Sequence, residues 1–446
     1  MQETRAGLEA DQAKTFRALI RYACPRAPYY ARIIRERQLD VDTCVPGDFP
    51  LLTKAILMEN FDDIVTDRRV SKQVIAEFLS RSTDPKELLF NELTVMHTSG
   101  TSGEVGYFLY SPADFRRLRA AAMRNRKAFR GQFPRLKWRL RRIRVAFYGA
   151  TGGHFAGVTG VASMQRGLRK LFIDARAFEV NTPLPEVVRA INAFDPDALW
   201  GYTTALKMLG DEQRAGRLSI KPKAVIATGE MVTQSDLQFL SQSFGGAQAL
   251  SLYACTEHMM LGISNPDGNT MTLLDDNVIF EFYEDHSVIT NLFNYTLPLI
   301  RYRMSDILRP VSAPQSRRIV IQNLVGRTEQ MPIFVNGAGA KDFISPHIIN
   351  EIFVKGVTRF QMQITGPSSF RFLICVDAGL DEPGRATAAA GVKARLTEIL
   401  AQKTLSNVAF EVKIVADIPL NERTRKFQLI VNQIPAQAAA CSAAAV

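Results

Sequence analysis

The chain has 446 residues, of which 46% are hydrophobic, 22% charged and 9% aromatic, values typical of a folded protein with more than one domain. These values exclude a disordered chain, and no run approaches the ~18 consecutive apolar residues of a membrane-spanning helix. The N-terminus is charged where a signal peptide would be apolar, and the five cysteines show no disulfide or zinc spacing. We therefore expect a cytoplasmic protein with reduced thiols.

The net charge of +11 comes from one stretch, residues 116–144, which holds thirteen Lys and Arg residues and no Asp or Glu. Such a stretch is typical of a positive face for an anionic partner, and nucleotide phosphates, an acidic carrier protein, nucleic acid and a membrane surface all fit it. A solvated helix face without a partner fits equally well. The sequence leaves these alternatives open.

The elements predicted along the first three quarters of the chain alternate between helices and strands. Helical spacing near residues 11–24 precedes several prolines, which predicts one helix followed by a looped approach to the core. Short β-branched or aromatic runs then alternate with helical patterns, which favours a layered α/β domain with at least partly parallel sheets. The candidate strands are residues 143–148, 223–228, 247–254, 277–283 and 287–293.

A second, smaller unit is predicted to begin near residue 326. Its pattern is that of a compact α+β domain. The expected elements are a helix over 346–355, strands over 358–364 and 370–376, a helix over 385–402 and a strand over 409–415. We therefore expect a large domain over 1–325, a small domain over 326–432, and a loose Ala-rich tail over 433–446.

The most distinctive local pattern follows the apolar run 93–96 and includes His97 and a Ser/Thr/Gly loop. Hydroxyls and unhindered backbone N–H groups in such a loop can surround a phosphate, although a plain surface loop has the same composition. No Gly-Lys-Ser/Thr follows, so the loop is not a Walker loop. The loop residues are Thr98, Ser99, Gly100, Thr101, Ser102 and Gly103.

Further along the chain, several predicted strands end in polar or acidic turns. Each turn taken alone has an ordinary structural explanation, such as a helix cap or a turn carboxylate. The segments are 224–230 (AVIATGE), 252–257 (LYACTE), 298–306 (PLIRYRMSD), 324–327 (LVGR) and 418–427 (IPLNERTRKF).

Taken together and in this order, these segments resemble the adenylate-forming enzymes, which activate carboxylic acids with ATP, and in particular their phenylacetate–CoA ligase-like branch. The loop at 98–103 is similar to that family's T-S-G-T-T-G motif, YACTE to its Y-G-x-T/S-E motif, and PLIRYRMSD to its P-L-I-R-Y-R-T-G-D motif. The likeness runs from about residue 15 to residue 432. It implies a large ATP- and acid-binding domain followed by a small, mobile α+β lid domain.

The resemblance also implies roles for individual residues. Residues 98–103 would hold the β- and γ-phosphates, Thr256 would contact the α-phosphate, and Glu257 would bind Mg²⁺. Lys426 would bridge the acid and phosphate oxygens. The other contacts implied are the adenine end for Gly229 and Glu230, the adenine ring for Tyr253, the ribose hydroxyls for Asp306, and the nucleotide at the domain junction for Arg327.

The sequence departs from the family pattern in three places. Glu104 and Val105 follow the phosphate loop where a Lys-Pro-like step is usual, Ala254 replaces a glycine, and Met304-Ser305 replace Thr-Gly. Two of these are exchanges of small residues. Glu104 places an acid near the expected triphosphate and points to altered nucleotide use.

The segment 148–155 (YGATGGHF) resembles the family's border of the carboxylate pocket. Tyr148, Gly152, Gly153 and His154 are the candidate pocket residues, while a tight turn with a core Phe is the alternative. A second candidate wall is the turn at 200–204. The class of acid stays open.

The expected reaction is formation of an acyl-adenylate, with release of pyrophosphate and then of AMP on transfer to a thiol. Coenzyme A or the phosphopantetheine of a carrier protein would be the acceptor. The alternative is a non-catalytic protein with a ligase-like scaffold that binds nucleic acid or another anionic surface through residues 116–144. That alternative leaves the preserved Glu257, Asp306, Arg327 and Lys426 unexplained.

Overall fold

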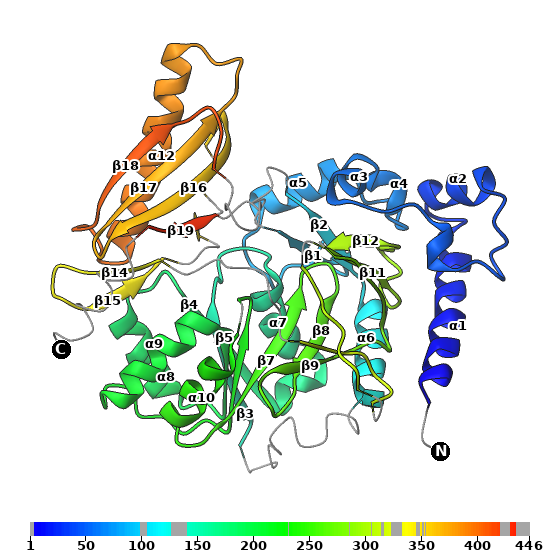
Figure 1. Cartoon of the computed structure of the whole chain (residues 1–446), viewed down its shortest axis with the longest axis horizontal. Coiled ribbons are helices and arrows are strands. Elements are labelled where there is room, and N and C mark those ends of the chain that lie inside the picture. Colours follow the sequence, from blue (N-terminus) through cyan, green and yellow to red (C-terminus); the bar gives the residue numbers. More distant parts are fainter. Residues whose placement is uncertain are drawn as a thin grey trace. The chain divides into compact units, whose positions relative to one another are not determined.

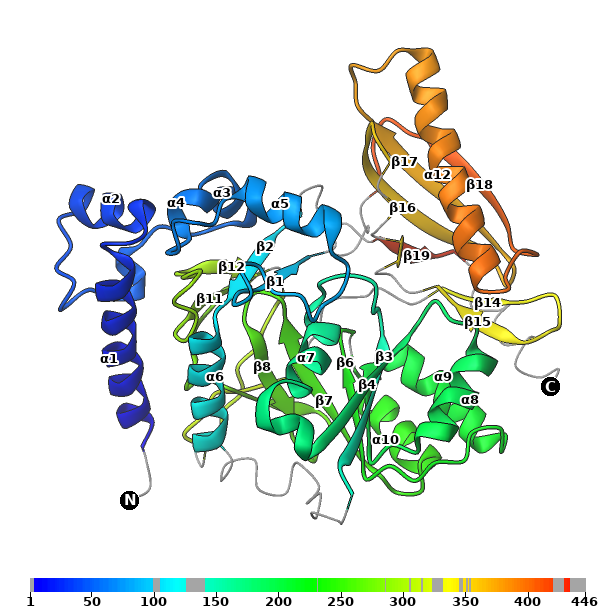
Figure 2. The same ribbon diagram turned by 180° about the vertical axis from the view of Figure 1, so that it is seen from behind.

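A computed structural model describes most of the chain (Figures 1 and 2). The described residues are 4–98, 105–125, 141–230, 232–284, 286–304, 306–313, 316–322, 332–344, 348–349, 352, 354–419 and 429–433. The chain forms two compact units, of which the first comprises Met1–Thr98, Gly106–Ala177 and Ile191–Arg327. The second comprises Ser99–Val105, Phe178–Ala190 and Thr328–Val446.

An eight-stranded sheet is the centre of the first unit, with the strand order β13-β9-β8-β7-β6-β5-β3-β4. Strands β3, β5, β6 and β7 are parallel to one another, and β8, β9 and β13 continue the sheet in antiparallel pairs. The predicted strands at 143–148, 223–228 and 247–254 are confirmed. The bounds are β3 Ile143–Gly149, β4 Ile173–Glu179, β5 Ala198–Tyr202, β6 Ala224–Thr228, β7 Gln248–Cys255, β8 Met259–Ser264, β9 Thr270–Leu273 and β13 Val320–Gln322.

Helix α7 (Ala156–Met164) packs closely on one face of this sheet (Figure 2). Phe147 on β3 and Trp200 on β5 are paired in register, and their rings meet at 4.7 Å between centroids. A Cβ atom at Gly157 would lie 2.5 Å from the Phe147 ring, and one at Gly160 would lie 2.9 Å from the Trp200 ring. The two glycines therefore allow the helix to approach the two large rings. Helices α9 (Thr203–Arg214) and α10 (Gln234–Ser243) pack on the sheet as well, against β5 and β7.

The lead-in to this sheet is more helical than the sequence predicts. After α1 (Arg5–Ala23) come α2 (Pro28–Glu36), the 3₁₀ turn η1 (Pro46–Asp48), α3 (Lys54–Glu59), α4 (Phe61–Ile64) and α5 (Lys72–Arg81). The expectation of one helix followed by a loop is therefore wrong. Pro28 begins α2, where its missing N–H costs no hydrogen bond, and Thr53 and Ser71 accept backbone N–H groups at the starts of α3 and α5.

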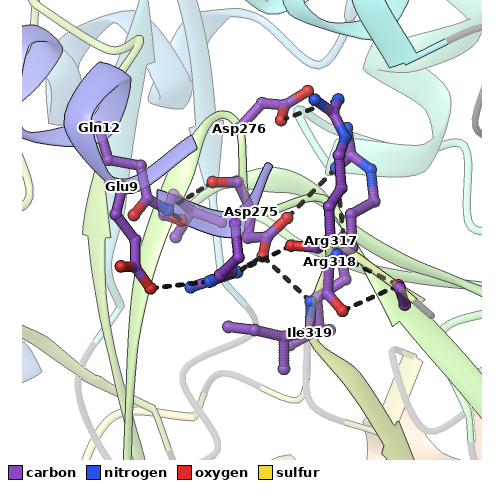
Figure 3. A network of polar contacts seen from close by, with 11 residues as sticks. Glu9, Gln12, Asp275, Asp276, Arg317, Arg318 and Ile319 are labelled. Atoms are coloured by element: carbon purple, nitrogen blue, oxygen red, sulfur yellow. Dashed lines mark hydrogen bonds and ion pairs between the residues drawn. The ribbon is translucent and has the colours of Figure 1, made fainter. Parts of the chain in front are cut away.

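Helix α1 is tied to the first unit by a buried charge network around Asp275 (Figure 3). The Asp275 carboxylate contacts Arg5 Nη1 at 2.5 Å and Arg318 Nη1 at 3.3 Å, and it accepts the Ile319 N–H at 3.1 Å. Gln12 donates to the Asp275 backbone oxygen at 2.6 Å. Burial raises the pKa of Asp275, and the two cations oppose that rise, so removal of either cation would favour protonation.

Two smaller antiparallel sheets complete the first unit. One is the pair β1 (Thr94–His97) and β2 (Tyr107–Tyr110), and α6 (Pro112–Asn125) follows β2. The other is β10 (Val278–Phe282), β11 (Ser287–Asn291) and β12 (Tyr302–Met304). Strands β10 and β11 lie within the candidate strands 277–283 and 287–293, whereas β12 is not among the candidate strands. Side chains from the lead-in helices and from both small sheets share one hydrophobic core.

The second unit is built on a four-stranded sheet in the order β18-β17-β16-β19, packed against α12 (Figure 1). The elements of this unit are β14 Ile333–Val335, β15 Lys341–Phe343, β16 Val357–Gly366, β17 Ser369–Val376, α12 Glu382–Gln402, β18 Ala409–Ile414 and β19 Ile430–Asn432. These confirm the strands and the helix predicted between 358 and 415. Of the helix expected over 346–355, half of the residues lie outside the described residues, 348 and 349 are helical, and 352, 354 and 355 are not. All but the first residue of the expected tail also lie outside the described residues.

A buried ion pair holds the second unit together. Lys403, fully buried after α12, contacts Asp342 on β15 at 2.8 Å and donates to the backbone oxygens of Val180 at 2.6 Å and Thr182 at 3.2 Å. The Lys403 ammonium also lies 4.7 Å from the centroid of the Phe343 ring. Burial lowers the pKa of Lys403 and raises that of Asp342, while each partner opposes the shift of the other.

Across the described part of the chain, none of the helices combines the length and the apolar character needed to cross a membrane.

Candidate functional site

The candidate site lies at the carboxyl ends of the parallel strands in the first unit. Tyr202, Thr228 and Leu252 are partners in register across β5, β6 and β7, and Tyr148 pairs with Gly201 one step before the end of β5. The segments after these strands therefore emerge at one edge of the sheet. The strand order reverses there, because β4 lies beyond β3 on one side and β5, β6 and β7 follow on the other. Ligands of open α/β sheets bind at such reversal points.

A buried hydrogen bond joins two of the predicted nucleotide residues. The Tyr253 hydroxyl on β7 donates to Asp306 Oδ2 at 2.7 Å, and both residues are buried. Ser287 fixes the Asp306 backbone by donating to its carbonyl oxygen at 2.9 Å. The carboxylate expected for the ribose is therefore held beside the aromatic ring expected for the adenine.

Gly229 and Glu230 form the turn after β6. Gly229 has a φ of 78°, and a Cβ atom there would lie 2.9 Å from the Tyr202 ring. Glu230 Oε2 accepts the backbone N–H of Thr204 at 2.8 Å, in the first turn of α9, where a negative charge is stabilised. The turn thus joins the ends of β5 and β6 and holds the Glu230 carboxylate against α9.

Thr256 and Glu257 follow β7 and are fixed through their backbone oxygens. Tyr110 donates to the Thr256 oxygen at 2.7 Å, and Asn291 donates to the Glu257 oxygen at 3.4 Å. Burial raises the pKa of Tyr110 well above its ordinary value, and the nearby Cys255 and Glu257 add to the rise. The Glu257 charge therefore lies close to the strand end.

The donor set at this edge suits a nucleotide with Mg²⁺. One carboxylate together with substrate phosphate oxygens is a usual way for a protein to hold Mg²⁺. Glu257 offers that carboxylate, and the described residues contain no group of three or more His, Cys, Asp and Glu that could form a complete protein metal site. Thr203 Oγ1, at the first position of α9, is buried and has no hydrogen-bond partner among the described residues, so a polar ligand would satisfy it.

Part of the predicted site falls outside the described residues: Ser99, Gly100, Thr101, Ser102, Gly103, Glu104, Arg327 and Lys426. Thr98 is the one residue of the predicted phosphate loop that the structure describes. Its N–H donates to the Gly106 oxygen at 2.9 Å, and its Oγ1 accepts the Gly106 N–H at 3.0 Å, which closes the pair of strands that carries the loop.

The candidate acid-binding segment after β3 contains both buried and open positions. Tyr148 is fully buried, and His154 is buried against Phe78 with its Nε2 3.3 Å from Ser82 Oγ. Among the described residues, no heavy atom lies within 4 Å of a Cβ atom placed at Gly152. The structure therefore places the His154 ring against α5 and leaves Gly152 as the position that a ligand can approach.

His97, for which the sequence motifs imply no role, lies next to this segment. A Cβ atom at Gly153 would lie 3.5 Å from His97 Nε2, and the His97 ring packs on Phe155 at 4.6 Å between centroids. Nδ1 lies 3.4 Å from the Thr98 backbone oxygen, which can only accept, so this contact favours the tautomer with its proton on Nδ1 and Nε2 as an acceptor. Burial lowers the pKa of His97 and keeps the ring neutral at pH 7. Its position directly before the phosphate loop is the sequence signal that could have identified it.

No protein-family model matches the chain, and no curated protein matches its sequence. Solved structures do match. With 2-hydroxyisobutyryl-CoA ligase in complex with 2-HIB-AMP and CoA in the thioesterification state, the TM-score is 0.59 at 18% identity, over 98% of this chain and 93% of that one. The chain has the fold of this ligase.

Other structures of the same ligase agree. In the postadenylation state with R3-HIB-AMP, the TM-score is 0.53 at 17% identity, over 97% of this chain and 91% of that one. With an open conformation of the ligase in complex with 2-HIB-AMP and CoA, the TM-score is 0.53 at 16% identity, over 94% of this chain and 90% of that one. The ligase fold thus spans both units of the chain, which confirms the expected α/β architecture with a smaller C-terminal part.

Proposed function

We propose that the protein activates a carboxylic acid with ATP as an acyl-adenylate and then transfers the acyl group to a thiol. The hydrogen bond between Tyr253 and Asp306 carries this proposal. It joins two motif residues that the resemblance assigns to the ring and the ribose of one nucleotide, at the sheet edge where this fold class binds ligands. Complexes of the ligase with 2-HIB-AMP and CoA support the same reaction class.

Different residues at the sheet edge would bind the ribose, the adenine and the phosphates of the nucleotide. Asp306 would accept the ribose hydroxyls, since a carboxylate oxygen can accept more than one hydrogen bond. Tyr253 would present its ring to the adenine while its hydroxyl holds Asp306 in place, and Gly229 and Glu230 would line the adenine end. Thr98 and the loop to Gly103 would hold the β- and γ-phosphates, and Thr256 would contact the α-phosphate.

Attack of a carboxylate on the α-phosphorus brings two anions together, so the reaction needs positive charge where they meet. Mg²⁺, when bound, would neutralise phosphate charge there, and Glu257 would hold it. Lys426 would bridge the acid and phosphate oxygens, and Arg327 would fix the nucleotide where the two units join in the sequence.

The acid would bind beside Gly152 and Gly153, with Tyr148 and His154 supporting the segment from within the core. His97 Nε2 would face the acid as a neutral acceptor. A neutral acceptor favours a hydrogen-bond donor, such as a hydroxyl or amide, on the acid and gives no attraction to its carboxylate. Coenzyme A is the proposed acceptor, a carrier-protein thiol is the second candidate, and a phenylacetate–CoA ligase-like subtype is the proposed branch.

Acid-dependent exchange of pyrophosphate into ATP tests the proposal. Purified protein with Mg²⁺ is screened against pools of aryl, fatty, hydroxy and amino acids. We expect exchange with one pool, and its loss in Asp306→Asn and Lys426→Ala. Asp42→Asn, which changes an exposed aspartate near α2, serves as the matched control and keeps full exchange.

The acceptor is tested next, with the acid that supports exchange. Formation of the CoA thioester is compared with loading of a phosphopantetheinylated carrier protein. Absence of exchange with every pool, in folded protein that also fails to bind ATP by calorimetry, would refute the proposed function.

A further inference from the structure

The 3₁₀ turn η2 (Gly167–Leu171), in the first unit, presents apolar side chains to solvent. Leu168 is 77% exposed, Leu171 is 60% exposed and the following Phe172 is 48% exposed. Leu168 and Leu171 are the most exposed large hydrophobic residues in the described part of the chain. Clustered apolar exposure of this kind marks an interaction site.

The same turn lies against the basic stretch of the sequence. The Ile143 N–H donates to the Phe172 backbone oxygen at 2.8 Å, and Arg142 Nη1 lies 3.4 Å from the Lys170 oxygen. Residues 141–144, the end of the basic stretch, therefore run beside η2. The side chains of Arg142 and Lys170 are exposed there.

Two further guanidinium groups lie near Arg169, which is part of the turn. Partial burial lowers the pKa of Arg169, and the positive charges of Arg119 on α6 and Arg166 lower it further, so these three cations lie near one another. Their mutual repulsion has no stabilising role in the fold, and an anionic partner would relieve it.

The carboxylates near this turn compensate little of that charge. The negative charge of Asp84 stabilises the charged form of Arg166. The Arg166 guanidinium also donates to the Lys86 backbone oxygen at 2.9 Å. Asp174 forms an ion pair with Arg176 at 3.3 Å. The stretch 116–144 contributes no carboxylate at all.

We propose that the η2 surface, formed by Leu168, Leu171 and Phe172 with Arg119, Arg142 and Lys170, docks the protein on the anionic surface of a lipid membrane. The leucines are exposed and no matched partner for them is required if the surface that they meet accepts apolar side chains of any shape. The interfacial region of a bilayer does this, and anionic headgroups attract the surrounding cations. Nucleic acid would use the cations but gives no reason for exposed leucines. The inference does not depend on the proposed function.

Flotation of the full-length protein with vesicles tests this docking. Vesicles of phosphatidylcholine alone are compared with vesicles that also contain phosphatidylglycerol. We expect binding to the anionic vesicles that weakens as salt increases, because exposed charges are screened. The variant Leu168→Ser/Leu171→Ser/Phe172→Ser should lose at least about tenfold in partitioning, since three apolar side chains no longer enter the interface.

Neutralisation of the cations provides a second, independent test of the docking. Arg119→Gln/Lys170→Gln should weaken partitioning about 25-fold, because each basic residue near an anionic membrane contributes about fivefold. Val45→Ser/Ile414→Ser removes two exposed apolar residues elsewhere and should bind like the parent protein. Circular dichroism of every variant checks that it is folded.

Three results would overturn the inference. The first is no binding to anionic vesicles at low salt, whether or not the protein retards RNA or binds an acidic protein. The second is equal binding to phosphatidylcholine vesicles and anionic vesicles. The third is unchanged binding by the folded serine variant, which would place any lipid contact elsewhere.

Discussion

The Tyr253 hydroxyl donates a 2.7 Å hydrogen bond to Asp306 Oδ2, and this bond links the end of β7 to the residues after β12. In the proposed nucleotide site, this bond would give Tyr253 a positioning role in addition to the aromatic surface of its ring. Loss of the hydroxyl alone leaves the ring in place, so the two contributions can be separated.

Tyr253→Phe is therefore expected to raise the KM for ATP by about tenfold and to change kcat little, because a hydrogen bond to a charged group contributes about 1.5–3 kcal/mol. Tyr253→Ala should weaken ATP binding further. The measurement is the ATP dependence of pyrophosphate exchange at saturating acid. An ATP KM that the Phe variant leaves unchanged would show that the hydrogen bond does not position the nucleotide site.

Substitution of His97 should weaken binding of the acid and leave binding of ATP unchanged. His97→Leu removes the Nε2 acceptor and is expected to raise the KM for the acid by about tenfold at an unchanged ATP KM. His97→Gln keeps an acceptor in reach and should recover part of the loss. Steady-state exchange at varied acid and at varied ATP measures both constants. If both KM values rise together, His97 acts on the fold of the loop and not on acid recognition.

Protein stability is expected to fall as the pH drops from about 6.5 to about 4. Fully buried His258 has its pKa lowered from 6.5 to about 4, chiefly by burial, against two backbone oxygens that favour its charged form. Between these values the unfolded chain binds a proton that the folded chain does not, so stability rises with pH across this window. The contribution of His258 is about 3 kcal/mol in full.

Urea unfolding at several pH values measures that slope. His97 and His154, whose pKa values are also lowered by burial, add to it in the same direction. His258→Gln should unfold with a clearly shallower pH dependence than the parent protein, whatever its absolute stability. Equal slopes in the two proteins would contradict a neutral buried His258.

The buried pair of Lys403 and Asp342 should be sensitive to removal of one partner. Lys403→Met leaves the Asp342 carboxylate buried without its cation and is expected to cost about 3–5 kcal/mol. Lys403→Met/Asp342→Leu removes both charges and should recover most of that loss. Arg395→Ala, which breaks an exposed ion pair with Glu398 in the same unit, is the control and should cost less than about 1 kcal/mol. Thermal unfolding followed by circular dichroism gives the comparison, and a double variant no more stable than the single one would contradict the pairing argument.

Elements with a local sequence pattern could be predicted without the structure. The β-branched runs at 143–148, 223–228 and 247–254 became β3, β6 and β7, because alternating helices and apolar strands can bury both faces of a sheet only in an α/β arrangement. The order of the polar turns along the chain predicted the fold through its resemblance to adenylate-forming enzymes, and the fold shared with the CoA ligase agrees with that prediction. In the lead-in the prolines predict a loop, whereas Pro28 starts a helix, because the first position of a helix needs no N–H donor.

Tertiary structure alone decided which distant residues meet. Tyr253 and Asp306, His97 and Gly153, and the η2 turn and the end of the basic stretch are brought together by strand register and helix packing. No periodic pattern encodes these pairs, because side-chain proximity across a fold depends on the geometry of every element between them. Burial, which lowers the pKa of His97 and His258, likewise follows from packing, since the same imidazole in an exposed turn would titrate near its ordinary value.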